Sequence, residues 1–252
     1  MPRKIIAMAA AAVALLSATF AQAQAAPVKN IVIVHGAFAD GSGWLRVTDI
    51  LGKDGYTVSV VQEPLTSLAD DVAATKRVLD MQQGPAILVG HSYGGVVITE
   101  AGNASNVVGL VYIAAFIPDQ GESAGGLLSK FPAANNDMRD TKDDFLYLDP
   151  AAFPADFAAD VPPVQASFMA HSQPMLAKAA AGAPVTAAAW RQKKSWALVS
   201  TLDRNINPDL ERSMAKHAGC ETVEVPASHS VYLSKPNDVA RLIERAAKAS
   251  AQ

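Results

Sequence analysis

Short apolar runs alternate with helical patterns along most of the chain, and this alternation is the feature that most limits the possible fold. Residues 31–34 read Ile-Val-Ile-Val and residues 86–89 read Ala-Ile-Leu-Val, with no polar position in either run. Such runs are typical of strands in a parallel sheet that is covered on both faces. A helical pattern lies between them at 67–82, where Ser67 opens a capping box and Gly84 follows the end. We therefore predict an α/β fold with a mainly parallel, doubly wound sheet.

The same patterns predict the other elements of the sheet and its helices. Strands are expected at 57–61, 107–114, 196–200 and 222–225, and helices at 44–51, from the turn after 89 to about 101, at 208–217 and at 236–249. The stretch from 119 to 194 is different, because it holds seven prolines and 15 alanines fall among the 44 residues from 151 to 194. Short helices between proline turns fit this composition, and a sheet does not. We predict a helical cap at about 120–194, inserted between two strands.

Residues 1–25 are predicted to be a signal peptide. A basic start precedes a 12-residue apolar run at 5–16, which is shorter than the roughly 20 residues of a membrane-spanning helix. The segment Ala-Gln-Ala-Gln-Ala at 21–25 contains two A-x-A cleavage patterns. We therefore expect a periplasmic or secreted protein that has no stable membrane association after cleavage, with 26–252 as one α/β domain.

Composition excludes several partners and cofactors. A chain of 252 residues with 50% hydrophobic and 18% charged residues can bury one sizeable core. The formal net charge of -3 gives no basic footprint, so nucleic acid is not an expected partner. Cys220 is the single cysteine, which excludes an intrachain disulfide and a cysteine-based zinc site.

The segment Gly90-His91-Ser92-Tyr93-Gly94 fits the pattern G-x-S-x-G. The pattern alone is weak, but here a predicted strand runs into it and a predicted helix leaves it. A sharp turn in that position lifts a serine hydroxyl above the edge of the sheet, where it can act as a nucleophile. A glycine-rich turn without chemistry is the alternative interpretation. We predict that Ser92 is the nucleophile.

A serine hydroxyl needs a base, which points to a histidine. His229 follows the predicted strand 222–225, so its loop opens at the same edge of the parallel sheet as Ser92, and we predict that it is the base. The other four histidines have other expected positions: His35 ends the first strand, His91 lies inside the motif and points away from the hydroxyl, His171 is in the cap, and His217 is in the last turn of a helix.

The base in turn needs a carboxylate that fixes its tautomer and stabilises the imidazolium. Asp203 follows the strand 196–200 and gives the chain order Ser, Asp, His. Asp119 follows the preceding strand and is the alternative. Two backbone N–H groups must also face the developing oxyanion. One is expected from Tyr93, directly after the nucleophile, and the other from the loop 35–44.

Together these motifs resemble the α/β-hydrolase superfamily. The resemblance rests on Val34-His35-Gly36-Ala37 with a later Gly-Trp, on Gly90-His91-Ser92-Tyr93-Gly94-Gly95, and on Asp203 and His229. The chain looks closest to a small esterase branch that contains plant methylesterases, hydroxynitrile lyases and bacterial exported esterases. The resemblance covers nearly all of the chain after the signal peptide, although the cap matches only in length and position. It implies that Ser92, Asp203 and His229 form a triad and that the N–H of Ala37 is the second oxyanion donor.

Two positions separate this chain from the hydroxynitrile lyases of that branch. The lyases carry a lysine directly after the histidine and a threonine in place of the glycine of His-Gly, whereas this chain has Ser230 and Gly36. Cyanohydrin cleavage is therefore not expected. A serine rather than an aspartate in the motif also argues against epoxide hydrolases and haloalkane dehalogenases.

We predict a serine esterase that cleaves carboxylic esters of small molecules and needs no metal or cofactor. The cap contains seven of the chain's 16 aromatic residues, so the ester is expected to be neutral. A lactonase, perhydrolase or C–C hydrolase could use the same triad, and a non-catalytic ligand-binding protein could keep the same fold. A dehydrogenase is not expected, because the loop after the first strand lacks the glycine spacing of a dinucleotide site. The sequence does not define the oligomeric state.

Overall fold

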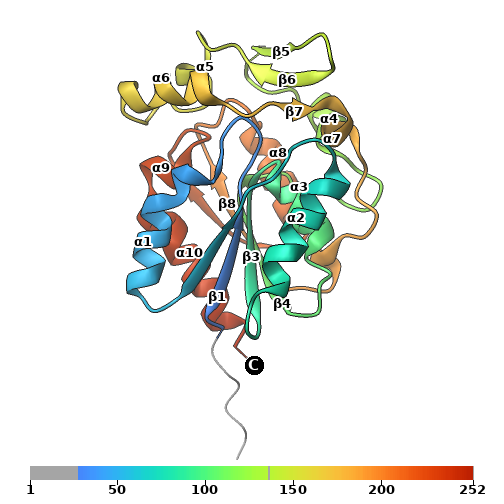
Figure 1. Ribbon diagram of the computed structural model, residues 1–252, viewed down its shortest axis with the longest axis vertical. Coiled ribbons are helices and arrows are strands. Elements are labelled where there is room, and N and C mark those ends of the chain that lie inside the picture. The colour runs from blue at the N-terminus through green and yellow to red at the C-terminus, as the bar shows by residue number, and fades with distance from the viewer. Residues whose placement is uncertain (1–27, 136, 252) are drawn as a thin grey trace, which may run out of the picture.

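The computed structural model describes residues 28–135 and 137–251, so the predicted signal peptide lies outside the described residues. A six-stranded sheet forms the centre of this part of the chain, in the order β2-β1-β3-β4-β8-β9 (Figure 1). All five strand pairings are parallel. The strands are β1 (Asn30–Val34), β2 (Thr57–Val61), β3 (Ala86–Ser92), β4 (Val107–Ala115), β8 (Ser195–Ser200) and β9 (Glu221–Val225). The predicted parallel α/β fold is confirmed.

Helices cover both faces of the sheet. One face carries α1 (Leu45–Lys53) and α10 (Pro236–Ala249), and the other carries α2 (Leu68–Asp80), α3 (Gly94–Ala101) and α8 (Pro208–His217). Successive side chains of β1 point to opposite faces, so Ile31 and Ile33 pack with α1 and α10 while Val32 and Val34 pack with the other layer. This double burial explains why β1 has an apolar residue at each of these positions.

The ends of several helices follow the capping residues in the sequence. The Ser67 hydroxyl accepts a hydrogen bond from the N–H of Asp70 at 3.1 Å, and α2 begins at the next residue. The Asn207 side chain caps α8 in the same way. The helix predicted at 44–51 is α1, which begins at Leu45, and a 3-10 turn, η1 (Gly41–Trp44), precedes it. A short helix that the patterns did not predict, α9 (Val231–Ser234), precedes α10.

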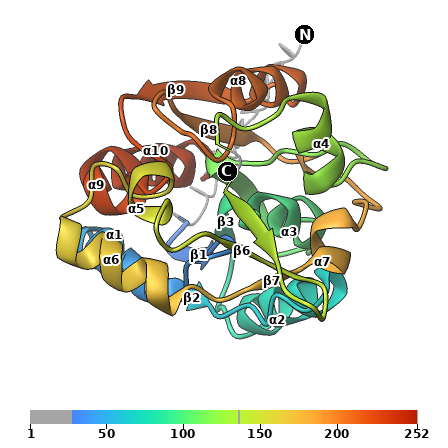
Figure 2. The same ribbon diagram turned by 90° about the horizontal axis from the view of Figure 1, so that it is seen from above.

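The segment between β4 and β8 forms a cap over the carboxyl ends of the strands (Figures 1 and 2). Its helices are α4 (Ala124–Lys130), α5 (Phe153–Asp156), α6 (Pro163–Ser172), α7 (Lys178–Gly182) and the 3-10 turn η2 (Ala189–Arg191). It also contains a three-stranded antiparallel sheet made of β5 (Met138–Asp140), β6 (Phe145–Leu148) and β7 (Leu176–Ala177).

The prediction that the cap contains no sheet is therefore wrong. No proline lies between Pro132 and Pro150, so the backbone N–H groups of this interval are free to pair. Asp144 has a φ of 64°, and the N–H of Phe145 donates to the Thr141 side chain at 2.9 Å, which closes the turn between β5 and β6. The hairpin depends on this local turn, which the alanine and proline content of the whole cap conceals.

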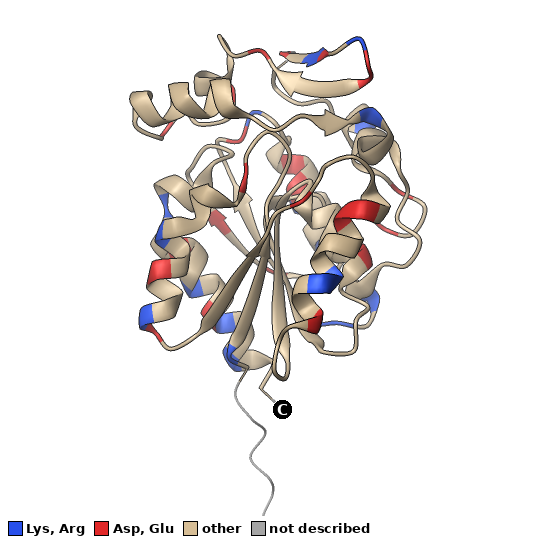
Figure 3. Cartoon of the chain, in the orientation of Figure 1, with Lys and Arg blue, Asp and Glu red and all other residues tan. Residues whose placement is uncertain are grey.

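Charged residues are absent from the inner strands of the central sheet. The four inner strands, β1, β3, β4 and β8, contain no Lys, Arg, Asp or Glu, and acidic and basic segments are interspersed over the outer helices (Figure 3). In the part of the chain that the structure describes, no helix combines the length and the apolar character needed to cross a bilayer.

Candidate active site

Ser92 ends β3 in a conformation that few non-glycine residues adopt. Its φ of 53° lies in the left-handed region, and the helix α3 starts two residues later. The turn is tight enough that a Cβ on Gly90 would lie 2.6 Å from the carbonyl oxygen of Gly94, and a Cβ on Gly94 would lie 2.4 Å from that of His35. The two outer glycines of G-x-S-x-G are therefore required by close backbone approaches, and the strained turn presents the Ser92 side chain at the edge of the sheet.

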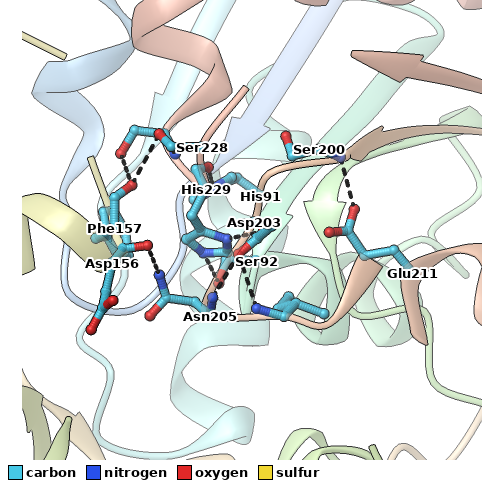
Figure 4. A network of polar contacts seen from close by, with 12 residues as sticks. His91, Ser92, Asp156, Phe157, Ser200, Asp203, Asn205, Glu211, Ser228 and His229 are labelled. Carbon is cyan, nitrogen blue, oxygen red and sulfur yellow. Dashed lines mark hydrogen bonds and ion pairs between the residues drawn. The ribbon is translucent and has the colours of Figure 1, made fainter. Parts of the chain in front are cut away.

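His229 faces Ser92 from the loop that follows β9. Its Nε2 lies 2.9 Å from the Ser92 Oγ, and Figure 4 shows its ring between Ser92 and Asp203. The Ser92 and His229 residues are only 8% and 1% exposed. This geometry lets a neutral His229 accept the hydroxyl proton of Ser92.

Asp203 holds the other side of the His229 ring. Its Oδ2 lies 2.5 Å from the Nδ1 of His229, and its Oδ1 accepts hydrogen bonds from the N–H groups of Asn205 and Ile206 at 2.7 and 3.0 Å. A carboxylate that accepts the Nδ1 proton leaves Nε2 free to accept the proton of Ser92. The structure thus brings Ser92, His229 and Asp203 together in the order that the sequence predicts.

Asp119, the alternative carboxylate, has different partners. It accepts a hydrogen bond from the Nε of Arg191 at 2.9 Å, and its Oδ2 lies 3.0 Å from the Nε2 of His217. Both partners are exposed side chains. Asp119 therefore joins the end of β4 to η2 and α8, and it does not contact His229.

His91 supports the His229 loop, a role that the sequence analysis did not assign. Its Nε2 lies 3.0 Å from the backbone carbonyl oxygen of His229, so Nε2 carries the proton and donates it. Burial lowers the pKa of His91 well below its usual range, with a smaller contribution from nearby His229. The ring is therefore neutral near pH 7. His91, the residue before the serine in G-x-S-x-G, therefore holds the main chain of His229, the predicted base, in place.

A segment of the cap binds both loops of the site (Figure 4). The carbonyl oxygen of Phe157 accepts hydrogen bonds from the N–H and Oγ of Ser230 at 3.0 and 2.9 Å, next to His229. The carbonyl oxygen of Asp156 accepts one from the Nδ2 of Asn205 at 2.8 Å, next to Asp203. These contacts link positions 49 and 73 residues apart through backbone carbonyls, so no side-chain pattern in the sequence signals them.

The two predicted oxyanion donors belong to residues beside Ser92. Ala37 and Tyr93 are 3% and 2% exposed, and both line the same cavity as Ser92 and His229. The hydroxyl of Tyr93 donates to the Oδ2 of buried Asp71 at 2.9 Å, which fixes the position of its ring. The N–H of Phe38 donates to the carbonyl of Pro174 at 3.2 Å, so the loop that carries Ala37 is tied to the cap.

The cavity above Ser92 is small and largely apolar, with a volume of about 120 Å³. Among its described lining residues, none is a Lys, Arg, Asp or Glu. Apolar side chains dominate the wall: Phe38, Phe116, Leu128, Met138, Leu146, Phe157, Leu176 and Ile206. Of the seven cap aromatics, Phe157 lines this cavity, whereas Phe153 is buried in the core.

In residues 28–135 and 137–251, no three or more His, Cys, Asp or Glu side chains are grouped so that they could hold a metal ion. The polar groups at the cavity are Ser92, His229 and the amides of Asn135 and Asn205. Their chemistry suits an uncharged organic molecule.

A parallel sheet with a serine on a strand-to-helix turn, and with a histidine and an aspartate from later loops beside it, is the arrangement of a hydrolase. A family model described as the alpha/beta hydrolase family matches residues 31–242. The chain belongs to this family, and the predicted superfamily membership is confirmed.

Three proteins illustrate this relationship. A carbendazim hydrolyzing esterase of Nocardioides sp. (strain SG-4G) is 33% identical over 40% of this chain, and the matched segment spans 48% of that relative's length. An alpha/beta hydrolase, nvfD, of Aspergillus novofumigatus (strain IBT 16806) is 27% identical over 86% of this chain and 96% of its own. The crystal structure of a pyrethroid hydrolase from Sphingobium faniae JZ-2 superposes with a TM-score of 0.75 at 20% identity, over 88% of this chain and 98% of that one.

Proposed function

We propose that this protein hydrolyses carboxylic esters of small neutral molecules through an acyl-enzyme intermediate. The observation that carries the proposal is the hydrogen-bonded series from Ser92 Oγ through the ring of His229 to Asp203, with distances of 2.9 and 2.5 Å, at an uncharged cavity. The names of two similar proteins, a carbendazim hydrolyzing esterase and a pyrethroid hydrolase, support a hydrolytic reaction.

In the first half-reaction, His229 takes the hydroxyl proton of Ser92 while the Oγ forms a bond to the ester carbonyl carbon. The N–H groups of Ala37 and Tyr93 stabilise the oxyanion that develops on the carbonyl oxygen. His229 then gives its proton to the alkoxy oxygen as the C–O bond breaks. The products are an alcohol and an acyl group on Ser92.

In the second half-reaction, water replaces the alcohol. His229 takes a proton from the water molecule while the water oxygen attacks the acyl carbon. His229 then gives that proton to the Ser92 Oγ as the bond between this oxygen and the acyl carbon breaks. Asp203 stabilises the positive charge of the ring in both halves and does not itself take the proton. Every step uses side chains and backbone groups of the protein, so no metal or cofactor takes part.

The cavity supports a preference for neutral esters with a short acyl group. Each methylene group of the acyl chain that is buried against the apolar wall stabilises the bound ester by about 0.8 kcal/mol. This gain ends when the cavity volume of about 120 Å³ is filled. A carboxylate on the substrate would lose its hydration without finding a cationic partner in the wall.

We also propose that the protein acts in the periplasm or outside the cell. This proposal rests on the predicted signal peptide at 1–25.

Substitution of the nucleophile tests the mechanism. Ser92→Ala removes the atom that forms the acyl bond, so ester turnover should fall by about 10⁶-fold, and a fluorophosphonate probe should label wild type at Ser92 and leave the variant unlabelled. Ser200→Ala is the matched control, since Ser200 is a buried serine of the same sheet, on β8, whose hydroxyl has no partner among the described residues. More than a few per cent of activity in Ser92→Ala would exclude the acyl-enzyme route.

A series of esters tests the substrate class. The p-nitrophenyl esters of neutral acids of increasing length should show kcat/KM rising over the first members and then falling, because the cavity fills. Matched esters whose acyl group ends in a carboxylate should react more slowly at every length. A preference for the anionic esters, or no dependence on length, would contradict this cavity as the acyl site.

A further inference from the structure

A second buried carboxyl group lies behind Asp203 and has no role in the steps above. Glu211 is on α8 and is 2% exposed. Its Oε2 accepts a hydrogen bond from the backbone N–H of Ser200 at 3.3 Å, at the end of β8, as Figure 4 shows. Its Oε1 has no donor within hydrogen-bonding distance among the described residues.

The carboxyl group next to Glu211 is that of Asp203, which already acts as a hydrogen-bond acceptor. The Glu211 carboxyl lies beside that of Asp203. The Oδ1 of Asp203 accepts hydrogen bonds from the Asn205 and Ile206 N–H groups, and its Oδ2 faces the Nδ1 of His229. Two ionised carboxylates offer only acceptors to each other and repel in a buried site. A proton on Glu211 removes both problems, because it turns the carboxyl into a donor toward Asp203.

The surrounding charges agree with a neutral Glu211. Burial raises the pKa of its carboxyl well above the usual range, and the negative charge of Asp203 raises it further. Arg212 follows it in sequence, but its guanidinium pairs with Glu224 at 2.8 Å and Asp209 at 2.7 Å. That cation is therefore engaged on the surface and opposes the rise in the pKa of Glu211 only weakly. Among the described residues, no cation forms a salt bridge with Glu211.

We propose that Glu211 is a positioning residue, protonated at neutral pH, whose carboxyl donates a hydrogen bond to Asp203 and so holds that carboxylate against His229. The inference rests on the proposed function of Ser92, His229 and Asp203. Glu211 anchors Asp203 from α8, whereas Asn205 and Ile206 anchor it from its own loop. It does not line the cavity, so it acts on the rate of the reaction and not on substrate binding.

The key variant is Glu211→Gln, which replaces a neutral donor by another neutral donor of nearly the same shape. It should keep kcat within about threefold of wild type and leave the acid limb of the pH–rate profile in place. Glu211→Leu removes the donor, and a lost hydrogen bond to a charged group should lower kcat by about tenfold or more, with KM unchanged. Met214→Ala, on the same helix, is the control for a general loss of packing.

An ionised Glu211 predicts a different result for Glu211→Gln. Removing a negative charge beside the Asp203–His229 pair would make the ring harder to protonate, so the acid limb would move to lower pH. Such a shift, or a loss of kcat in Glu211→Gln as large as in Glu211→Leu, would overturn the proposal. So would a drop in kcat for Met214→Ala that equals the drop for Glu211→Leu.

A titration of the His229 ring by NMR separates this proposal from the proposed function. Its midpoint should be the same in wild type and Glu211→Gln, whether or not any ester is hydrolysed. If wild type cleaves no ester but the midpoint is unchanged in the variant, only the proposed function fails. If wild type cleaves esters and the midpoint moves in Glu211→Gln, only the role of Glu211 fails. Glu211→Gln also carries the test if Glu211→Leu does not fold.

Discussion

The loops that follow β4 and β8 leave neighbouring parallel strands at the same edge of the sheet, and each carries an aspartate. Asp203, after β8, is 3% exposed, accepts hydrogen bonds from two backbone N–H groups, and faces His229. Asp119, after β4, has a side chain that is 16% exposed and is paired with Arg191 and His217. The same position in the topology thus gives two different environments.

The difference shows what a carboxylate needs in order to serve a histidine. Neutral N–H donors hold Asp203 in place without cancelling its charge, so the charge remains available to an imidazolium. The guanidinium of Arg191 already neutralises Asp119, so a second cation would gain little from it. Chain order alone left both residues open, and the partners of each residue distinguish them.

The largest effect that sharpens this comparison is expected from Asp203→Asn. An amide at this position favours the wrong tautomer of His229, which costs about 10⁴-fold in kcat in the well-known serine protease case. We expect a loss of that order for a p-nitrophenyl ester measured near pH 8, with the fold retained by circular dichroism. The matched control is Asp119→Asn, which should change kcat by less than about threefold. The opposite result in the two variants would assign the carboxylate to the loop after β4.

Asp119→Asn should instead lower the free energy of unfolding. Partial burial raises the pKa of Asp119, but the hydrogen bonds from Arg191 and His217 outweigh it and lower the pKa to about 2 from the ordinary 3.8. A carboxyl whose pKa is lower in the folded chain stabilises the fold above pH 3.8, and this contribution is lost as the pH falls toward 2. Because Arg191 is 55% exposed, water screens the pair, and we expect only about 1 kcal/mol.

Urea unfolding at pH 7 and at pH 3 measures this contribution. The difference in the free energy of unfolding between wild type and Asp119→Asn should be about 1 kcal/mol at pH 7 and smaller at pH 3. A difference that grows as the pH falls would contradict the depressed pKa of Asp119.

Much of the sheet and the chemical residues could be predicted from the sequence, because short-range patterns specify both. The double burial of β1 requires apolar residues at successive positions, and the close approaches at Gly90 and Gly94 require glycine. The loop order then places His229 at the edge where Ser92 ends its strand. Each of these signals is contained in a few consecutive residues.

The contacts that complete the site have no such signal. The carbonyl of Phe157 accepts from Ser230, and the side chain of Glu211 reaches Asp203 from a helix that begins five residues after it. Backbone acceptors carry no residue preference, and a glutamate on an amphipathic helix looks like any surface position. The cap sheet was missed for a related reason, since its hairpin depends on the turn at Thr141 and Asp144.

The smallest effect in this comparison is expected from His217→Ala. His217 is 61% exposed, and its Nε2 lies 3.0 Å from Asp119, so the pair is worth about 0.3–0.5 kcal/mol. Alanine also has a higher helix propensity than histidine at the end of α8, by about half a kcal/mol, which offsets the loss. The net change in the free energy of unfolding should therefore lie within about 0.5 kcal/mol of zero.

A double-mutant cycle of His217→Ala with Asp119→Asn removes the propensity difference and isolates the interaction between the two side chains. The cycle should give a smaller coupling than one between Asp119→Asn and Arg191→Gln, because Arg191 makes two hydrogen bonds to Asp119. A larger coupling for His217 would mean that the histidine, and not the arginine, holds Asp119 away from the site.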